Sequence, residues 1–192
     1  EEDVDTEEQE FGPRTIAVGE GHLFDAVEAP ALATNLSDES GTQLYDGYTL
    51  FERGGETVGI VGMTNPYIDR MAPAFHEGKY RFGKSPVLLD RTAREARTAG
   101  ADVVVAVTEI GLPWMVQAAK DFESVDVALS AHTHEYTYEP ILVDRTGTVV
   151  IESGMGEALG RIDLRFDENG TAFRHVLYAF AETAPYTPSP DA

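Results

Sequence analysis

The sequence contains no cysteine among its 192 residues. Disulfide bonds and thiolate metal sites are therefore excluded, so any metal ion must be held by histidine, carboxylate, amide or water. Such ligands favour Mn²⁺, Fe²⁺ or Mg²⁺, and they also suit Zn²⁺. No apolar run approaches the roughly 18 residues that a membrane-spanning helix needs, so membrane insertion is not expected. With 42% hydrophobic and 25% charged residues, the composition is that of a folded globular chain.

Positive charge is also scarce. Lysine and arginine number 14 against 34 aspartates and glutamates, which leaves a formal net charge of −20. Such a surface repels nucleic acid and anionic lipid, so neither is an expected partner. Charge repulsion of this size is screened in concentrated salt, where the Debye length falls to about 3 Å at 1 M. We therefore expect a high-salt source, and an ordinary acidic protein is the alternative.

The length suits one domain with a substantial core. Residues 1–13 are mostly acidic or polar and are expected to be a disordered segment, residues 14–183 to form the domain, and residues 184–192 to be a Pro-rich tail. The chain begins with Glu1-Glu2-Asp3 rather than a native start. We take this to mean that a leader was removed or that the sequence was shortened.

Hydrophobic patterns predict alternating strands and helices. Strands are expected at 15–18, 31–36, 48–52, 58–62, 101–107, 125–129, 140–144, 148–152, 160–167 and 172–179, and helices at 87–99 and 114–122. The helix, strand, helix, strand array between 87 and 134 implies a right-handed crossover and a parallel pair of strands. The loop from Thr64 to Pro86 is long, and loops of that length are more often functional than idle.

Two histidines stand at the end of the predicted strand 125–129. In Ala131-His132-Thr133-His134, imidazoles two residues apart can aim at one point, which would form half of a metal centre. The alternative is a pair of histidines that are solvated or bonded to backbone.

Polar side chains follow two other predicted strands. Glu20 and His22 come after strand 15–18, and Glu109 comes after strand 101–107. Ligands of α/β folds gather at the carboxyl ends of the strands. We therefore expect a polar site shared by these residues and the two histidines.

Several segments resemble the calcineurin-like metallophosphoesterases, in particular their 5′-nucleotidase branch, from about Arg14 to Thr183. They are Ile16–Asp25, Ala31–Leu36, Val58–Thr64, Gly100–Gly111 and Val125–His134. The loop 65–83 is similar, more weakly, to the thiosulfohydrolases of sulfur oxidation. The resemblance implies an α/β (α+β) fold with a layered β-sheet core, flanking helices and an antiparallel C-terminal half.

In this family two metal ions clamp a phosphoryl group, generate a hydroxide nucleophile and neutralise charge in the transition state. By resemblance, His132 and His134 bind metal. His22 resembles the unligated histidine that stabilises the transition state or protonates the leaving group.

The sequence departs from the family pattern at several ligand positions. The motifs Asp-x-His and Gly-Asp-x-x-Asp are expected upstream of Arg14, and residues 1–13 contain neither, so the N-terminal part of the family fold is missing. The segment containing Glu20 has no equivalent of the ligand Asn, and Glu109 stands where the family has a ligand His. We therefore expect one divalent ion rather than two, held by Glu20, Glu109, His132 and His134. The alternative is that the two glutamates are surface acids of an acidic chain and bind no metal.

Further residues are candidates for substrate binding. Arg81 is a candidate anion clamp in an acidic chain, and His76 is a candidate pocket residue, with solvent exposure as the alternative. The aromatic side chains of Tyr67, Phe75, Tyr80 and Trp114 could stack on a base or ring, although packing is the commoner role.

Two function hypotheses follow. The first is a metal-dependent phosphoesterase-type hydrolase, 5′-nucleotidase-like, acting on a nucleotide or other small phosphate ester in an extracellular, periplasmic or cell-surface location. It would be incomplete or weakly active as this chain alone, with an upstream domain or a second chain completing the site. The second is a catalytically degenerate relative that serves as a binding or assembly module.

Overall fold

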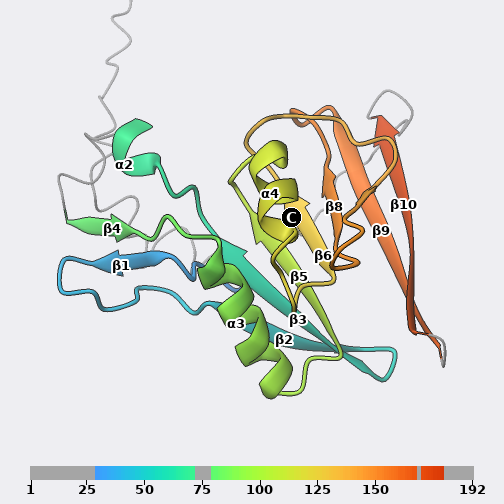
Figure 1. The fold of residues 1–192 in the computed structure, drawn as a ribbon, viewed down its shortest axis with the longest axis horizontal. Coiled ribbons are helices and arrows are strands. Elements are labelled where there is room, and N and C mark those ends of the chain that lie inside the picture. Colours follow the sequence, from blue (N-terminus) through green and yellow to red (C-terminus); the bar gives the residue numbers. More distant parts are fainter. Residues whose placement is uncertain (1–28, 72–78, 168–169, 180–192) are drawn as a thin grey trace, which may run out of the picture.

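The computed structural model describes residues 29–71, 79–167 and 170–179. Its largest element is a six-stranded sheet, whose strands are β2 (Tyr48–Arg53), β3 (Glu56–Met63), β5 (Val103–Thr108), β6 (Val127–Ser130), β7 (Ile141–Leu142) and β8 (Val149–Glu152). The strand order is β2-β3-β5-β6-β8-β7 (Figure 1). Strands β3, β5, β6 and β8 are parallel, and β2 and β7 pair antiparallel at the two edges. This mixed sheet confirms the α/β class.

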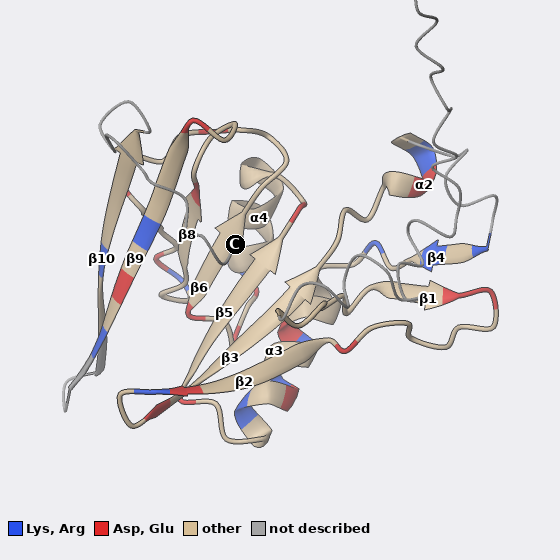
Figure 2. Ribbon diagram, turned by 180° about the vertical axis from the view of Figure 1, so that it is seen from behind, with Lys and Arg blue, Asp and Glu red and all other residues tan. Residues whose placement is uncertain are grey.

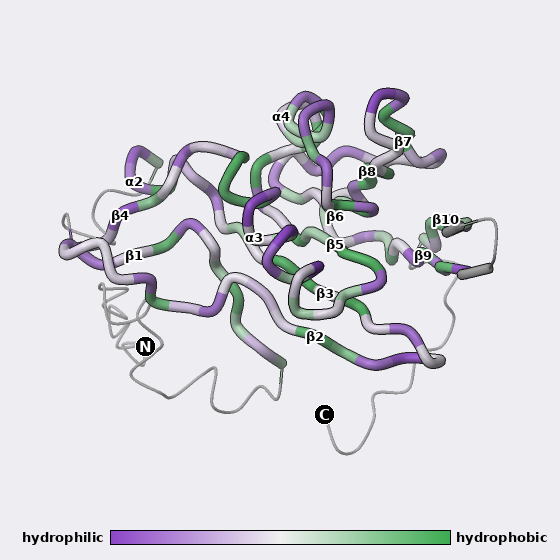
Figure 3. Tube along the Cα trace, turned by 60° about the horizontal axis from the view of Figure 1, so that its bottom comes forward, coloured by the Kyte–Doolittle hydropathy of each residue, from purple (hydrophilic) through white to green (hydrophobic). Residues whose placement is uncertain are grey.

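The sequence of the parallel strands explains their central position. Strands β5, β6 and β8 are almost continuous runs of valine, alanine, leucine and isoleucine, the composition of strands covered on both faces. The middle of each of these strands carries no charged residue (Figure 2). The residues along β3 and β5 are largely hydrophobic (Figure 3). The predicted parallel pair is confirmed. In the C-terminal half, β8 pairs in parallel with β6 and antiparallel with β7, and β9 pairs antiparallel with β10.

Two helices cover one face of the sheet, α3 (Val87–Thr98) and α4 (Leu112–Ala119). Both agree with the predicted helices within three residues. Helix α3 presents Leu89, Ala93 and Ala96 to the sheet, and all three are fully buried. Burying a leucine side chain contributes roughly 1.5–3 kcal/mol.

A long hairpin covers part of the other face. Its strands are β9 (Ala158–Asp167) and β10 (Gly170–Ala179), which pair antiparallel as the sequence predicts. Ile162 and Leu164 of β9 pack on a second core layer formed by Val105, Val127, Val149 and Ile151. The sheet therefore lies between helices on one side and the hairpin on the other (Figure 1).

The predicted strand 31–36 differs in the structure. Only its last residue is in a strand, β1 (Leu36–Asp38), which pairs with β4 (Tyr80–Phe82) in a separate two-stranded sheet. The preceding segment crosses the end of the large sheet, where Thr34 donates its N–H to the carbonyl of Gly62 at 2.8 Å. A Cβ on Gly62 would lie 2.5 Å from the carbonyl oxygen of Leu32, so glycine permits this close crossing. The hydrophobic pattern correctly indicates that this segment is buried, but the segment does not pair along its length as a strand of the sheet.

The long loop from Thr64 to Pro86 contains two short elements, α2 (Ile68–Met71) and β4. His76 lies outside the described residues, as do Glu20, His22 and the predicted strand 15–18. The boundaries of the predicted domain, at 14 and 183, also fall outside, so the division into segments stays a prediction. Among the described residues, no helix has the length and apolar character needed to cross a membrane.

His175 gives the hairpin a pH-dependent stability. Both ring nitrogens are buried and lack a hydrogen-bond partner among the described residues, and burial lowers the pKa of His175 from 6.5. As pH falls below about 6.5, the unfolded chain takes up a proton more readily than the folded chain, so the free energy of unfolding should decrease. We expect urea unfolding at about pH 5.5 and about pH 7.5 to show this loss, and His175→Phe to reduce it. Equal pH dependence in the variant would contradict the assignment.

Candidate functional site

Neighbouring parallel strands bring polar side chains to one edge of the sheet. Asn65 follows β3, Glu109 follows β5, and His132 follows β6. Backbone bonds continue the ladder past the strand ends, because Glu109 N–H donates to Met63 at 3.2 Å and Ala131 N–H donates to Thr108 at 2.9 Å. The loops therefore leave the sheet together, which places their side chains side by side.

Glu109 and His132 meet at this edge. The Glu109 Oε1 atom lies 3.7 Å from His132 Nδ1, and the two side chains are 53% and 34% exposed. The pair is accessible to solvent and to a ligand. Glu109 and His132, from two of the strand ends that were predicted to converge, therefore lie side by side, and the shared site as a whole stays a prediction.

Asn65 is a member of the site that the sequence did not reveal. Its side chain is buried, and its Oδ1 accepts a hydrogen bond from the Tyr67 N–H at 2.8 Å. This bond turns the amide nitrogen toward His132, where Nδ2 lies 3.3 Å from Nδ1. An amide N–H that donates to Nδ1 leaves the proton of the neutral ring on Nε2. The available signal was its position just after the predicted strand 58–62.

The loop that carries the histidines has an unusual backbone. His132 has φ of 101° and His134 has φ of 58°, and these are the non-glycine residues with positive φ in the described part of the chain. Such values are uncommon for residues with a Cβ and turn the two side chains in directions that an extended segment would not give. His134 is exposed, and no described contact joins it to Glu109.

A buried carboxylate holds the loop that carries His132 and His134. Glu152, at the end of β8, is 2% exposed and accepts hydrogen bonds from Thr133 Oγ1 at 3.1 Å and from the Glu135 N–H at 3.1 Å. Thr133 Oγ1 in turn accepts the Leu112 N–H at 2.9 Å. Glu152 does not stand out in the sequence, because it is one acid among many in an acidic chain.

Gly111 lets the two loops pack closely. It has φ of 86°, and a Cβ there would lie 2.8 Å from the Thr133 methyl carbon. Its N–H donates to the Ala131 carbonyl at 2.9 Å. The start of α4 is thus joined to the histidine loop, so Glu109 and His132 are held in fixed relation.

Glu109 and His132 are two donors of the kinds that bind divalent ions, but two donors do not make a metal site. Two donors bound to one ion at about 2.1 Å stand roughly 3.0–3.4 Å apart, close to the 3.7 Å between Glu109 and His132. An ion bound at Nδ1 would displace the Asn65 bond. Within the described residues, no group of three or more histidine and carboxylate side chains could hold a metal ion. The remaining ligands would have to come from elsewhere, and the predicted ligand Glu20 lies outside the described residues.

Open space borders Glu109. A cavity of 460 Å³ is lined by Ile60, Val107 and Glu109, among others, which is enough for a small-molecule ligand. Arg81 is exposed on β4, in the separate sheet that lies to the side in Figure 1. No hydrogen bond or ion pair among the described residues links Arg81 to Glu109, Asn65 or His132, so its role as an anion clamp stays a prediction.

Two curated proteins that act on nucleotides, by their names, are similar in sequence to this chain. No family model matches the sequence. The apyrase of Tabanus yao is 23% identical over 179 residues, which covers 80% of this chain and 31% of that protein. The trifunctional nucleotide phosphoesterase of Bacillus subtilis is 26% identical over 132 residues, which covers 64% of this chain and 8% of that protein.

Solved structures give a similar picture. A sulfate thiohydrolase of Thermus thermophilus superposes with a TM-score of 0.76 at 28% identity, covering 84% of this chain and 30% of that one. A 5′-nucleotidase precursor of Thermus thermophilus shares the fold, with a TM-score of 0.71 at 18% identity, covering 88% of this chain and 36% of that one. The chain thus spans less than two fifths of the length of each of these proteins.

Proposed function

Because the chain belongs to the calcineurin-like metallophosphoesterases of the 5′-nucleotidase group, we propose that it is a metal-dependent hydrolase of nucleotides or other small phosphate esters. The observation that carries the proposal is the meeting of Glu109 and His132, 3.7 Å apart, at the carboxyl edge of the parallel strands. Carboxylate and imidazole are ligands suited to Mn²⁺, Fe²⁺ or Zn²⁺.

The residues of this chain would have different roles in the proposed hydrolysis. Glu109 and His132 would hold one divalent ion, with Glu20 and His134 as further ligands, and Asn65 orients the His132 ring through its contact with Nδ1. A bound divalent ion would lower the pKa of a water molecule coordinated to it and would offset the negative charge of the phosphoryl oxygens. In the hydrolysis a water oxygen would attack phosphorus and the bond from phosphorus to the alcohol oxygen would break. The proton that the water gives up would balance the proton that His22 donates to the leaving oxygen, unless His22 only stabilises the transition state.

The chain covers 31% of the apyrase and 30% of the thiohydrolase, so activity of the whole protein would need more than these residues. We propose that an upstream domain or a second chain completes the site and that this chain alone is weakly active. A location outside the cytoplasm is supported by the structural neighbour described as a precursor. The net charge of −20 supports a high-salt setting.

A direct test is to incubate the purified chain with Mn²⁺ in concentrated salt and to measure phosphate release from AMP and from 4-nitrophenyl phosphate. We expect bound metal by elemental analysis, near one ion per chain, and slow release that stops when the metal is chelated. Absence of both metal and turnover would contradict the proposal and favour the binding or assembly module.

A further inference from the structure

The thioether of Met71 contacts the side chain that orients His132. Met71 Sδ lies 3.5 Å from Asn65 Nδ2, and the same nitrogen lies 3.3 Å from His132 Nδ1. An amide nitrogen carries two hydrogens, so it can donate one to each acceptor. We propose that Met71 is a site of reversible oxidation by peroxides, and that its sulfoxide draws Asn65 away from His132 and frees the imidazole nitrogen.

The backbone brings Met71 back to Asn65. Helix α2 ends at Met71, whose N–H donates to the Tyr67 carbonyl at 3.1 Å. The Tyr67 N–H in turn donates to Asn65 Oδ1 at 2.8 Å, which fixes the oxygen side of the amide. Nδ2 is therefore the amide atom that faces both the sulfur and the imidazole, and any change at the sulfur acts on it first.

Met71 is accessible to an oxidant. Of the four methionines, Met63 and Met115 are 3% and 0% exposed, whereas Met71 and Met155 are 58% and 63% exposed. With hydrogen peroxide, the sulfur attacks one oxygen and is oxidised by two electrons as the O–O bond breaks. The other oxygen leaves as water, taking the proton of the oxygen that stays. Among the described residues, no hydrogen bond links Met155 to Asn65 or His132, so Met155 serves as a matched control.

Oxidation must change the contact between Met71 and Asn65. An oxygen on the sulfur that pointed at Nδ2 would stand inside the about 2.7–3.2 Å of an N–H···O bond, so the two side chains must separate. A sulfoxide is polar and accepts hydrogen bonds more strongly than a thioether, so the amide follows it. Because Oδ1 is fixed, the adjustment falls on Nδ2, the atom that also contacts His132.

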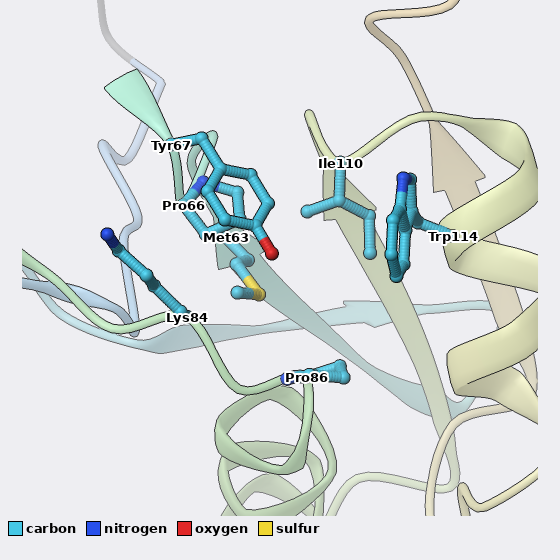
Figure 4. Close-up of a pocket in the computed structure, with 7 residues that line it drawn as sticks. All are labelled: Met63, Pro66, Tyr67, Lys84, Pro86, Ile110 and Trp114. Atoms are coloured by element: carbon cyan, nitrogen blue, oxygen red, sulfur yellow. The ribbon is translucent and has the colours of Figure 1, made fainter. Parts of the chain in front are cut away.

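The turn that carries Asn65 has room to adjust. It faces a pocket of 40 Å³, about the space of one water molecule, which separates Tyr67 from Ile110 and Trp114 (Figure 4). Since Tyr67 is not packed against the loop after β5, the turn can shift without displacing Glu109. The oxidised chain should therefore keep the Glu109 loop in place and lose the Asn65 contact to His132.

Release of the imidazole rests on these contacts alone, whereas its use to regulate a metal site rests on the proposed function. The Met155→Leu chain leaves Met71 as its exposed methionine. It is treated with hydrogen peroxide, freed of excess peroxide and compared with the untreated chain. We expect the NMR signals of the Asn65 side-chain amide and the His132 ring to shift. Since one hydrogen bond contributes about 0.5–1.5 kcal/mol, Mn²⁺ should bind about two- to tenfold more tightly once Asn65 no longer competes for Nδ1.

Met71→Leu is the control, because leucine has a similar volume and no sulfur. Treated in the same way, it should keep its signals and its Mn²⁺ affinity, and methionine sulfoxide reductases should reverse the changes in the Met155→Leu chain. Oxidation of Met71 that leaves the His132 signals unchanged, or that weakens Mn²⁺ binding, would overturn the inference. Shifted signals in a chain that binds no Mn²⁺ in either form would support the release of His132 and remove only the proposed function.

Discussion

The variant His132→Ala is expected to lose metal binding and ester hydrolysis together. His132 contributes the imidazole that faces the Glu109 carboxylate at 3.7 Å, and both loops that carry these residues leave adjacent parallel strands. Residues that only support a metal ligand cost 10- to 100-fold in affinity when mutated, so loss of the ligand itself should cost at least about 100-fold. Mn²⁺ affinity measured by calorimetry and phosphate release measured in parallel should fall by similar factors.

Two controls make this result interpretable. Glu109→Gln keeps the size of the side chain but removes its charge, and it should also weaken Mn²⁺ binding. Glu139→Gln removes an exposed carboxylate on the same histidine loop and should leave both measurements unchanged. If Glu109→Gln and Glu139→Gln reduced affinity equally, the general negative charge rather than the Glu109–His132 pair would attract the ion.

The second large effect is expected from Glu152→Ala. The change leaves the Thr133 hydroxyl and the Glu135 N–H, which now bond to a buried carboxylate, without an acceptor. Hydrogen bonds to a charged group contribute about 1.5–3 kcal/mol each, and the partners left behind are themselves only part-buried. We expect the free energy of unfolding to fall by about 2–3 kcal/mol, which lowers Tm by roughly 4–12 °C for a chain of this size.

Glu152→Gln is the matched variant, because its amide oxygen can still accept both bonds but lacks the negative charge that strengthens them. It should lose about half as much stability as Glu152→Ala. Imidazole NMR signals of His132 and His134 should broaden or shift in Glu152→Ala, since the loop loses its support. If Glu152→Ala lost the expected stability while the histidine signals stayed unchanged, Glu152 would stabilise the fold without holding the histidine loop in place.

The fold was readable from the sequence wherever hydrophobic runs match strand length. The β-branched segment Val103-Val104-Val105 gave a central parallel strand, and Arg53-Gly54-Gly55-Glu56 gave the turn of an edge hairpin. The segment 31–36 was less readable, because an apolar run marks burial and does not say which backbone groups it will bond. Its backbone hydrogen bonds go to Asp46, just before β2, and to Gly62 near the end of β3, instead of forming a full ladder.

The site was only half readable for a similar reason. His132 and Glu109 can be selected from the sequence, because their residue types bind metals and each follows a predicted strand. Asn65 and Glu152 do not, because an amide in a loop and an acid in an acidic chain are both common. Their importance comes from burial and from the partner atoms they face, which are properties of the folded chain.

The backbone at His132 has a consequence for how this loop is built. A φ of 101° is a conformation that glycine adopts freely and that other residues adopt at a cost of order 1–3 kcal/mol. Glycine would therefore relax the loop, and a chain selected for folding alone has every reason to carry it there. An imidazole at this position is therefore what we expect if its ring, rather than its contribution to folding, is what the protein uses.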